Sequence, residues 1–295
     1  MMTQINTVLL SAGIHGNEKT GIYLVKKFQE NKELASRKSF ITKTLLINTK
    51  AIKLNRRYCE IDLNRCFDLK NINNPDINYY EKLLAQKTYQ QVQELKIDFV
   101  LDFHTSTSNM GLTLLLSSNK PFNLQLAAYL ALRNPLVKIV CTPNNKDKNR
   151  FRNIFPLGFT VEMGAIAPNV VDPIWFKRAE ELVIQILDYI EGTNQQQQSQ
   201  FASTITVYSL FKTIYFPTDN QGEITGMVHP QLHGNDYCAL NPDEPMFLTF
   251  DGNSIFYQGK DTVYPLFINE TAYWEQKIAM YLATKEEIEI SAVQN

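Results

Sequence analysis

The chain has 295 residues, enough for one large domain or two modest ones. Its 29 lysine and arginine residues nearly balance its 30 aspartate and glutamate residues, and this formal net charge of -1 excludes a strongly basic nucleic-acid-binding surface. No apolar run approaches the roughly 18 residues of a membrane span, and the N-terminus lacks a signal-peptide pattern. The four cysteines form no C-x-x-C pair, which excludes a zinc ribbon. We therefore expect a soluble cytoplasmic protein with free thiols.

Strand and helix patterns alternate along the first two-thirds of the chain. Apolar runs predict strands at residues 7–12, 40–48, 97–103, 112–116, 136–141 and 159–161. Helical spacing of apolar residues predicts helices at residues 18–30, 75–96, 121–134 and 172–191. This order predicts an α/β fold in which helices flank a mostly parallel sheet.

The character of the sequence changes after residue 191. Residues 192–200 (GTNQQQQSQ) are polar and low in complexity, which is typical of a linker or of a frayed helix end followed by a loop. Short β-rich runs follow at residues 203–208, 223–228, 246–250 and 262–268, and residues 269–282 have a helical pattern. We therefore expect two domains, an α/β domain at 1–195 and a smaller β-rich domain at 196–295.

Two of the four histidines lie where predicted strands end. His15 follows the first strand with Glu18 at H-x-x-E spacing, and His104 follows the strand at 97–103. Sites gather at the carboxyl ends of strands in such sheets, and two imidazoles with one carboxylate suit a zinc ion that keeps a fourth position open for water. Asp102 is placed either to orient an imidazole or to act as an ordinary salt-bridge or capping residue. The simpler alternatives are a surface histidine beside a helix-opening glutamate and a hydrogen-bonded histidine at a strand end.

A carboxylate and a group of arginines form two further candidate sites. Glu162 lies at the end of another apolar strand, where it is either a buried hydrogen-bond acceptor or an acid/base group with a raised pKa. Arg56, Arg57 and Arg65 lie in a segment with few counter-charges. A solvated cationic loop is the simplest interpretation, although the planar guanidinium also suits carboxylate binding.

These motifs together resemble the aspartoacylase/succinylglutamate desuccinylase family, which shares the zinc carboxypeptidase fold. The matching motifs are HGNE at 15–18, DLNR at 62–65, DFHT at 102–105 and G-x-x-x-E-x-G at 158–164. The resemblance implies that His15, Glu18 and His104 bind one zinc ion per subunit. It also implies that Glu162 is the general base and that Arg57 polarises the scissile carbonyl.

The same resemblance implies a set of substrate-binding residues. They are Asn64, Arg65, Arg152, Tyr273 and Lys277. Asp62 is expected to hold the arginine loop in place, and the C-terminal domain to cap the active-site entrance through Tyr273. His229 and His233 belong to this second domain rather than to the metal site. The sequence departs from the family pattern at Lys148, where the family often has tyrosine, and at residues 164–169 (GAIAPN).

The expected activity is zinc-dependent hydrolysis of the amide bond of N-acyl amino acids. N-acetyl-L-aspartate is the expected substrate, because two arginines can pair with its two carboxylates. The alternatives are a deacylase of N-acetyl aromatic amino acids, a carboxypeptidase-like hydrolase and a zinc-binding protein without turnover. We expect a small-molecule substrate, no nucleic-acid or membrane partner, and a homodimer.

Overall fold

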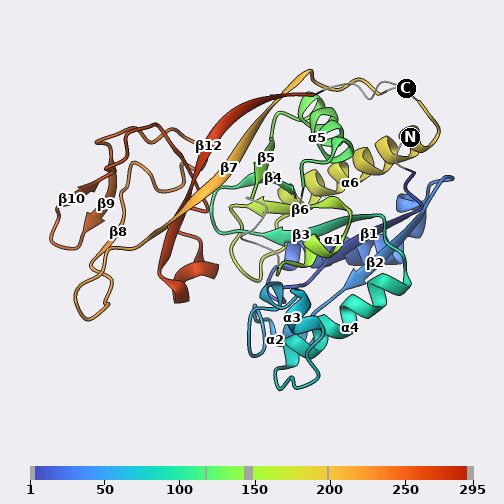
Figure 1. Cartoon of the computed structure of the whole chain (residues 1–295), viewed down its shortest axis with the longest axis horizontal. Helices are drawn as coiled ribbons and strands as arrows, with labels where there is room; N and C mark the ends of the chain where they lie inside the picture. Colours follow the sequence, from blue (N-terminus) through green and yellow to red (C-terminus); the bar gives the residue numbers. More distant parts are fainter. Residues whose placement is uncertain (1–3, 117, 143–148, 198, 291–295) are drawn as a thin grey trace.

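The structure is a computed structural model, and it describes residues 4–116, 118–142, 149–197 and 199–290 (Figure 1). The strands are β1 (Thr7–Ala12), β2 (Ile41–Leu46), β3 (Phe99–Thr105), β4 (Gly111–Leu116), β5 (Val137–Cys141), β6 (Leu157–Gly164), β7 (Thr204–Tyr215), β8 (Gly226–Val228), β9 (Pro245–Thr249), β10 (Ser254–Phe256), β11 (Tyr264–Leu266) and β12 (Ile278–Glu289). The α-helices are α1 (Lys19–Glu30), α2 (Thr49–Leu54), α3 (Leu69–Ile72), α4 (Tyr80–Glu94), α5 (Pro121–Arg133) and α6 (Pro173–Asn194). None of these helices combines the length and apolarity needed to cross a bilayer.

A mixed sheet runs through the molecule. Within the described residues it has nine strands in the order β11-β12-β7-β5-β4-β6-β3-β1-β2. Strands β2, β1, β3 and β6 are parallel neighbours, whereas β4 runs antiparallel to β6, and β7, β12 and β11 pair antiparallel. The parallel centre is buried on both faces, which explains the nearly continuous apolar runs of β1 and β3. The predicted α/β fold with helices flanking the sheet is confirmed, and the antiparallel pairs make that sheet a mixed one.

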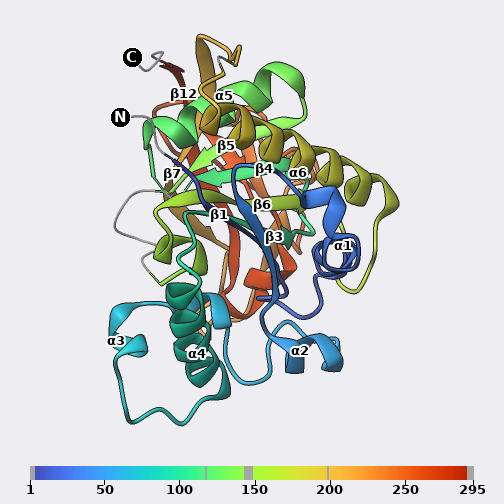
Figure 2. The ribbon, with the colours of Figure 1, turned by 90° about the vertical axis from the view of Figure 1, so that its right-hand side faces the viewer.

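Helices cover the two faces of this sheet. Helices α1, α5 and α6 lie on one face, and α3 and α4 lie on the other (Figure 2). Successive side chains of a strand point to opposite faces, so Val8 and Leu10 pack into the core beneath α1 and α6, whereas Leu9 packs into a second core with Ala85 of α4. The two cores fix the β1 and β3 ends that carry the HGNE and DFHT motifs.

The predicted helix at 269–282 is wrong. Thr271–Gln276 forms a short 3-10 helix, η4, and Ile278–Glu289 forms β12, which pairs antiparallel along the length of β7. Ala279, Met280 and Leu282 are almost fully buried, so the neighbouring strand and the core override the local helical pattern.

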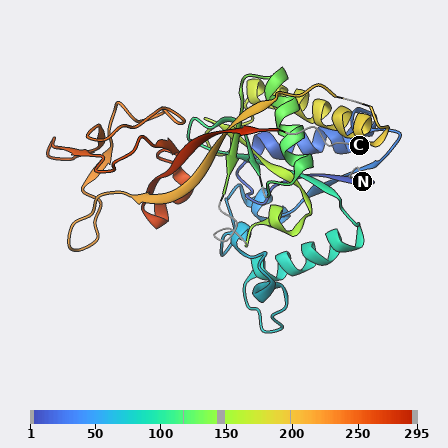
Figure 3. The same cartoon turned by 45° about the horizontal axis from the view of Figure 1, so that its top comes forward.

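The chain enters and leaves its C-terminal region through two long strands. β7 leads out of the main sheet to a small sheet of order β10-β9-β8, and β12 leads back (Figures 1 and 3). Helix α6 continues to Asn194, so it extends into the predicted 192–200 linker, of which residue 198 lies outside the described residues. The boundary after residue 195 stays a prediction.

Gly16, in the loop between β1 and α1, lies directly against the backbone of α2. A Cβ atom there would lie 2.1 Å from the carbonyl carbon of Ala51 and 2.3 Å from the nitrogen of Ile52, both in α2. We expect Gly16→Ala to lower the free energy of unfolding by about 2–3 kcal/mol, because backbone atoms must move to relieve the overlap.

Urea unfolding of the purified variant measures this loss. Gly192→Ala in α6 is the matched control, since its Cβ would meet no atom closer than 3.5 Å and alanine favours a helix over glycine. If the Gly16→Ala variant were as stable as the unmodified protein, the close contact between residue 16 and the backbone of α2 would be contradicted.

Candidate active site

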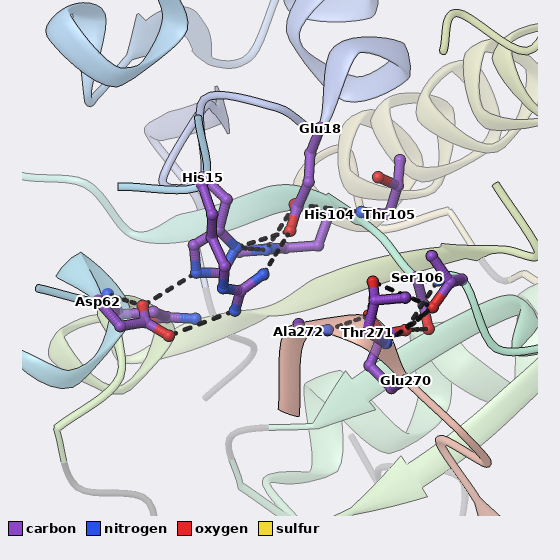
Figure 4. Close-up of polar contacts among 12 residues, drawn as sticks. His15, Glu18, Asp62, His104, Thr105, Ser106, Glu270, Thr271 and Ala272 are labelled. Carbon is purple, nitrogen blue, oxygen red and sulfur yellow. Dashed lines mark hydrogen bonds and ion pairs between the residues drawn. The ribbon is translucent and has the colours of Figure 1, made fainter. Parts of the chain in front are cut away.

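Three side chains meet at the carboxyl ends of β1 and β3. His15 and Glu18 lie in the β1–α1 connection, and His104 lies near the end of β3, the parallel neighbour of β1. Glu18 Oε1 lies 2.7 Å from His15 Nδ1, and Glu18 Oε2 lies 3.0 Å from His104 Nδ1. All three side chains are buried and point toward one another (Figure 4), with ligand atoms within 4.8 Å of one another. The H-x-x-E spacing thus converges with the distant histidine as the sequence predicted.

In each of the two imidazoles, the ring nitrogen that does not contact Glu18 contacts another carboxylate. His104 Nε2 lies 2.9 Å from Asp102 Oδ2, and His15 Nε2 lies 3.0 Å from Asp62 Oδ1. We assign the ring proton to each Nε2, which leaves both Nδ1 lone pairs facing the same point, 3.2 Å apart. Carboxylate-backed histidines are typical metal ligands. Two imidazoles and one carboxylate with room for a further ligand fit a catalytic zinc ion.

The charges around this cluster favour a cation. Burial alone would raise the pKa of Glu18, but the adjacent His15 and His104 outweigh it and hold the pKa well below its usual value. Burial alone would lower the pKa of His104, whereas Glu18 and Asp102 raise it well above its usual value. The carboxylates around the cluster therefore favour a positive charge at its centre, which a metal ion can supply in place of a proton.

Arg57 lies beside the three candidate ligands. One terminal nitrogen is 3.2 Å from Glu18 Oε1 and the other is 3.3 Å from Asp62 Oδ2. Burial would lower the pKa of Arg57, but Asp62 and Glu18 more than compensate, so the guanidinium stays charged. It faces the same pocket as the three candidate ligands. In that position it can stabilise negative charge that develops on a bound carbonyl oxygen.

Glu162 lies beside His104, on the neighbouring strand of the sheet. The two residues are register partners on the parallel strands β3 and β6. Burial is the main cause that raises the pKa of Glu162 to about 7, with a smaller increase from Glu18 and an opposing effect of His104. A carboxylate with a pKa near neutrality suits proton transfer in either direction at physiological pH.

A central pocket brings these groups together. Its lining includes His15, Glu18, Arg57, Asn64, His104, Arg150, Glu162, Glu270 and Tyr273. A second pocket adjoins it, which we call the arginine pocket; its lining includes Asn64, Thr142, Arg150, Arg152, Glu162 and Tyr273. Of the substrate-binding residues expected from the resemblance, Asn64 and Tyr273 line both pockets and Arg152 lines the second.

Two of the expected substrate-binding residues lie elsewhere. Arg65 donates to the backbone oxygen of Asn64 and lies 3.9 Å from Asp62 Oδ2, outside the lining of both pockets. The ammonium of Lys277 donates to the carbonyl oxygen of Gly222, and Lys277 is also outside the lining of both pockets, so its role toward the substrate stays a prediction. Lys148 lies outside the described residues.

Comparison with known proteins identifies the family. Residues 4–190 match the succinylglutamate desuccinylase/aspartoacylase catalytic domain, and residues 203–285 match the AstE/AspA barrel-sandwich hybrid domain. The chain belongs to the succinylglutamate desuccinylase/aspartoacylase family. A protein of Trichodesmium erythraeum described as a probable aspartoacylase is 45% identical over 98% of this chain and 100% of its own length. A Rattus norvegicus N-acyl-aromatic-L-amino acid amidohydrolase (carboxylate-forming) is 34% identical over 97% of this chain and 92% of its own.

The structural relatives agree with this assignment. Murine aminoacylase 3 superposes with a TM-score of 0.93 at 33% identity, and the match covers 100% of both chains. The resemblance to the family is therefore confirmed over the whole chain, including the region of η4 and β12.

The sequence alone did not identify two carboxylates of this family member as parts of the site. Asp62 was expected only to hold the arginine loop, yet it also contacts His15. Glu270 is buried and accepts hydrogen bonds from Ser106 and Thr107, which follow His104, and from the backbone N–H of Ala272 (Figure 4). Glu270 thereby ties η4, which carries Tyr273, to the end of β3. The position of Glu270 at the N-cap of η4 became visible only in the structure.

Asp62→Asn tests the link between the arginine loop and the metal ligands. We expect metal affinity to fall about 10- to 100-fold, because the amide no longer supports His15 as a carboxylate does. Titration of the metal-depleted protein with zinc in the presence of a competing chelator measures the affinity. Asp98→Asn, which changes a carboxylate that accepts from the backbone of Asn6 and Thr7 at the opposite end of β1, is the control. An unchanged zinc affinity in the Asp62→Asn variant would contradict the role of Asp62.

Proposed function

We propose that the protein is a zinc-dependent deacylase that hydrolyses the amide bond of N-acyl amino acids, with N-acetyl-L-aspartate as its substrate. The observation that carries the proposal is the convergence of His15, Glu18 and His104 in one pocket with Glu162 and Arg57. The names of the relatives support the same reaction class, since aspartoacylases and N-acyl-aromatic-L-amino acid amidohydrolases are both among them.

The chain's own residues divide the reaction between them. His15, Glu18 and His104 would hold the zinc ion, which would supply a Lewis acid that polarises the amide carbonyl and makes water more acidic. Glu162 accepts the proton of the attacking water and returns it to the leaving amine nitrogen. Arg57 stabilises the negative charge that develops on the amide oxygen, and its contacts with Glu18 and Asp62 hold it in place before the reaction.

The arginine pocket supports an acidic substrate. Arg152 is buried there, and one of its terminal nitrogens donates to Thr142 Oγ1 at 2.8 Å. Asn64 Oδ1 accepts from the backbone N–H of Phe151, and this hydrogen bond holds the Asn64 side chain at the wall of the pocket that it lines. A guanidinium and an amide donor together suit a carboxylate.

Arg152→Gln tests the choice of N-acetyl-L-aspartate. We expect kcat/KM for N-acetyl-L-aspartate to fall about 10- to 100-fold, since one charge-assisted contact with a carboxylate is lost. The value for N-acetyl-L-alanine, which has no side-chain carboxylate, should change by less than about threefold. Acetate release measures both rates, and equal losses for both substrates would contradict the assignment of Arg152 to a side-chain carboxylate.

A deacylase of N-acetyl aromatic amino acids is the second candidate. Phe267, Tyr273 and Tyr281 also line the arginine pocket, and aromatic walls suit an aromatic side chain. A wild-type enzyme that cleaves N-acetyl-L-tyrosine faster than N-acetyl-L-aspartate would favour this candidate. Zinc binding without acetate release would favour a non-catalytic protein. We also propose a reducing cytoplasmic location, in keeping with four free cysteines.

A further inference from the structure

Glu81 is a buried carboxylate that lines neither the central pocket nor the arginine pocket. It lies in the first turn of α4 and is fully buried. Its Oε1 accepts hydrogen bonds from the backbone N–H of Cys59 at 2.6 Å and from Asn48 Nδ2 at 3.2 Å. Its Oε2 accepts from the backbone N–H of Glu60 at 3.1 Å and of Ile61 at 3.3 Å. A buried charge is costly unless hydrogen bonds stabilise it, and four N–H donors do so here.

The three backbone donors form the middle of the segment 57–62, which belongs to no helix or strand. Arg57 begins this segment and contacts Glu18, and Asp62 ends it and contacts His15. The backbone between these two residues has no ladder of regular hydrogen bonds to hold it. Its consecutive N–H groups donate to one carboxylate of α4 instead. Glu81 therefore holds the chain between the two residues that contact the candidate metal ligands.

Further hydrogen bonds join α4 to the same region. Glu60 Oε2 accepts from the backbone N–H of Tyr80 at 2.6 Å, so the segment and the start of α4 bind each other in both directions. Asn48, the side-chain partner of Glu81, donates its own backbone N–H to the carbonyl oxygen of Gly13 at 2.9 Å. Gly13 directly follows β1 and leads into the HGNE motif. One network thus connects Glu81 to both loops of the site.

We propose that Glu81 is a positioning residue for the reaction and that it acts through Arg57. When its carboxylate is lost, three N–H groups lose their acceptor, and the segment that carries the Arg57 guanidinium can shift. A preorganised charge stabilises a transition state without reorganisation, and a displacement of about 1 Å can lower a rate about 100-fold. This inference rests on the role of Arg57 in the proposed function, and it assigns a task to a residue outside both pocket linings.

Hydrogen exchange and kinetics of the zinc-loaded enzyme test this inference. Glu81→Gln keeps the size of the side chain but replaces one acceptor oxygen with an N–H₂ group that faces N–H donors. We expect the backbone N–H groups of residues 59–61 to exchange about 10- to 100-fold faster in this variant. The kcat for N-acetyl-L-aspartate should fall about 10- to 100-fold with KM nearly unchanged, since Arg57 acts on the transition state. Rates are measured at saturating zinc, so that an effect on metal affinity through Asp62 does not enter them.

A double-mutant cycle separates positioning from a general loss of structure. Arg57→Gln should lower kcat about 10²- to 10³-fold. Adding Glu81→Gln should lower it by less than about threefold more, because the residue through which Glu81 acts is already removed. Glu81→Asp keeps both acceptor oxygens on a shorter side chain, so it should give the same pattern with a smaller loss, and it serves as the test if the Glu81→Gln protein does not fold.

Glu191→Gln is the matched control. Glu191 of α6 also accepts from consecutive backbone N–H groups, those of Lys38 and Ser39, but this segment precedes β2 at the end of the sheet opposite the site. Its kcat should equal that of the unmodified enzyme. Unchanged exchange of residues 59–61 in Glu81→Gln, or losses that multiply in the double mutant, would overturn the inference. An unmodified enzyme that releases no acetate from any N-acetyl amino acid would instead overturn the proposed function, and the exchange measurement would still show whether Glu81 holds the segment.

Discussion

Glu162→Gln should lower kcat about 10²- to 10⁴-fold for every substrate and leave zinc binding unchanged. Glutamine keeps the size and a hydrogen-bonding oxygen of Glu162 but cannot accept the proton of the attacking water. The carboxylate suits this task because burial raises its pKa to about 7. Zinc affinity should be retained, since His15, Glu18 and His104 supply the ligand atoms. Acetate release and metal analysis of the same sample measure the two effects.

Glu181→Gln, which changes an exposed residue of α6, is the matched control for this variant. It makes the same chemical change far from the pocket, so its kcat should equal that of the unmodified enzyme. If Glu162→Gln retained full activity, another group would have to accept the proton, and the assignment of Glu162 as the base would be wrong.

His104→Ala should abolish both tight zinc binding and acetate release. One of the three ligand atoms is lost, and Glu18 loses a partner that keeps its carboxylate charged. A catalytic metal supplies several kcal/mol of transition-state stabilisation, so we expect a rate loss of roughly 10³-fold or more. Zinc should also raise the Tm of the unmodified protein, because a ligand that binds only the folded state stabilises it.

His233→Ala provides the comparison for this loss. His233 is exposed in the C-terminal region, and its removal should leave the zinc-induced rise in Tm intact. Scanning calorimetry with and without zinc follows this rise in each variant. A rise that persists in His104→Ala would show that zinc binds elsewhere on the chain.

The parts of the fold and site that rest on local patterns were predictable from the sequence. β1, β3 and β6 are buried apolar runs, so their positions and the strand ends that carry His15, His104 and Glu162 followed directly. His15 and Glu18 are three residues apart, so their convergence needed only a tight turn.

The parts that rest on long-range contacts were not predictable. Asp62 lies 47 residues from His15, and Glu270 lies 164 residues from Ser106, so only the folded chain brings these partners together. β12 has a local helical pattern that pairing with β7 overrides. Glu81 has no motif, and its contacts with residues 59–61 became visible only in the folded chain.

The central claim is that zinc at His15, Glu18 and His104 is required for cleavage of an N-acyl amino acid. The most direct test strips the purified protein of metal with a chelator, then restores zinc in steps while acetate release from N-acetyl-L-aspartate and bound zinc are both measured. We expect activity to rise in proportion to bound zinc and to level off at one zinc per chain. Activity that survives complete removal of metal, or zinc that binds without restoring acetate release, would contradict the account.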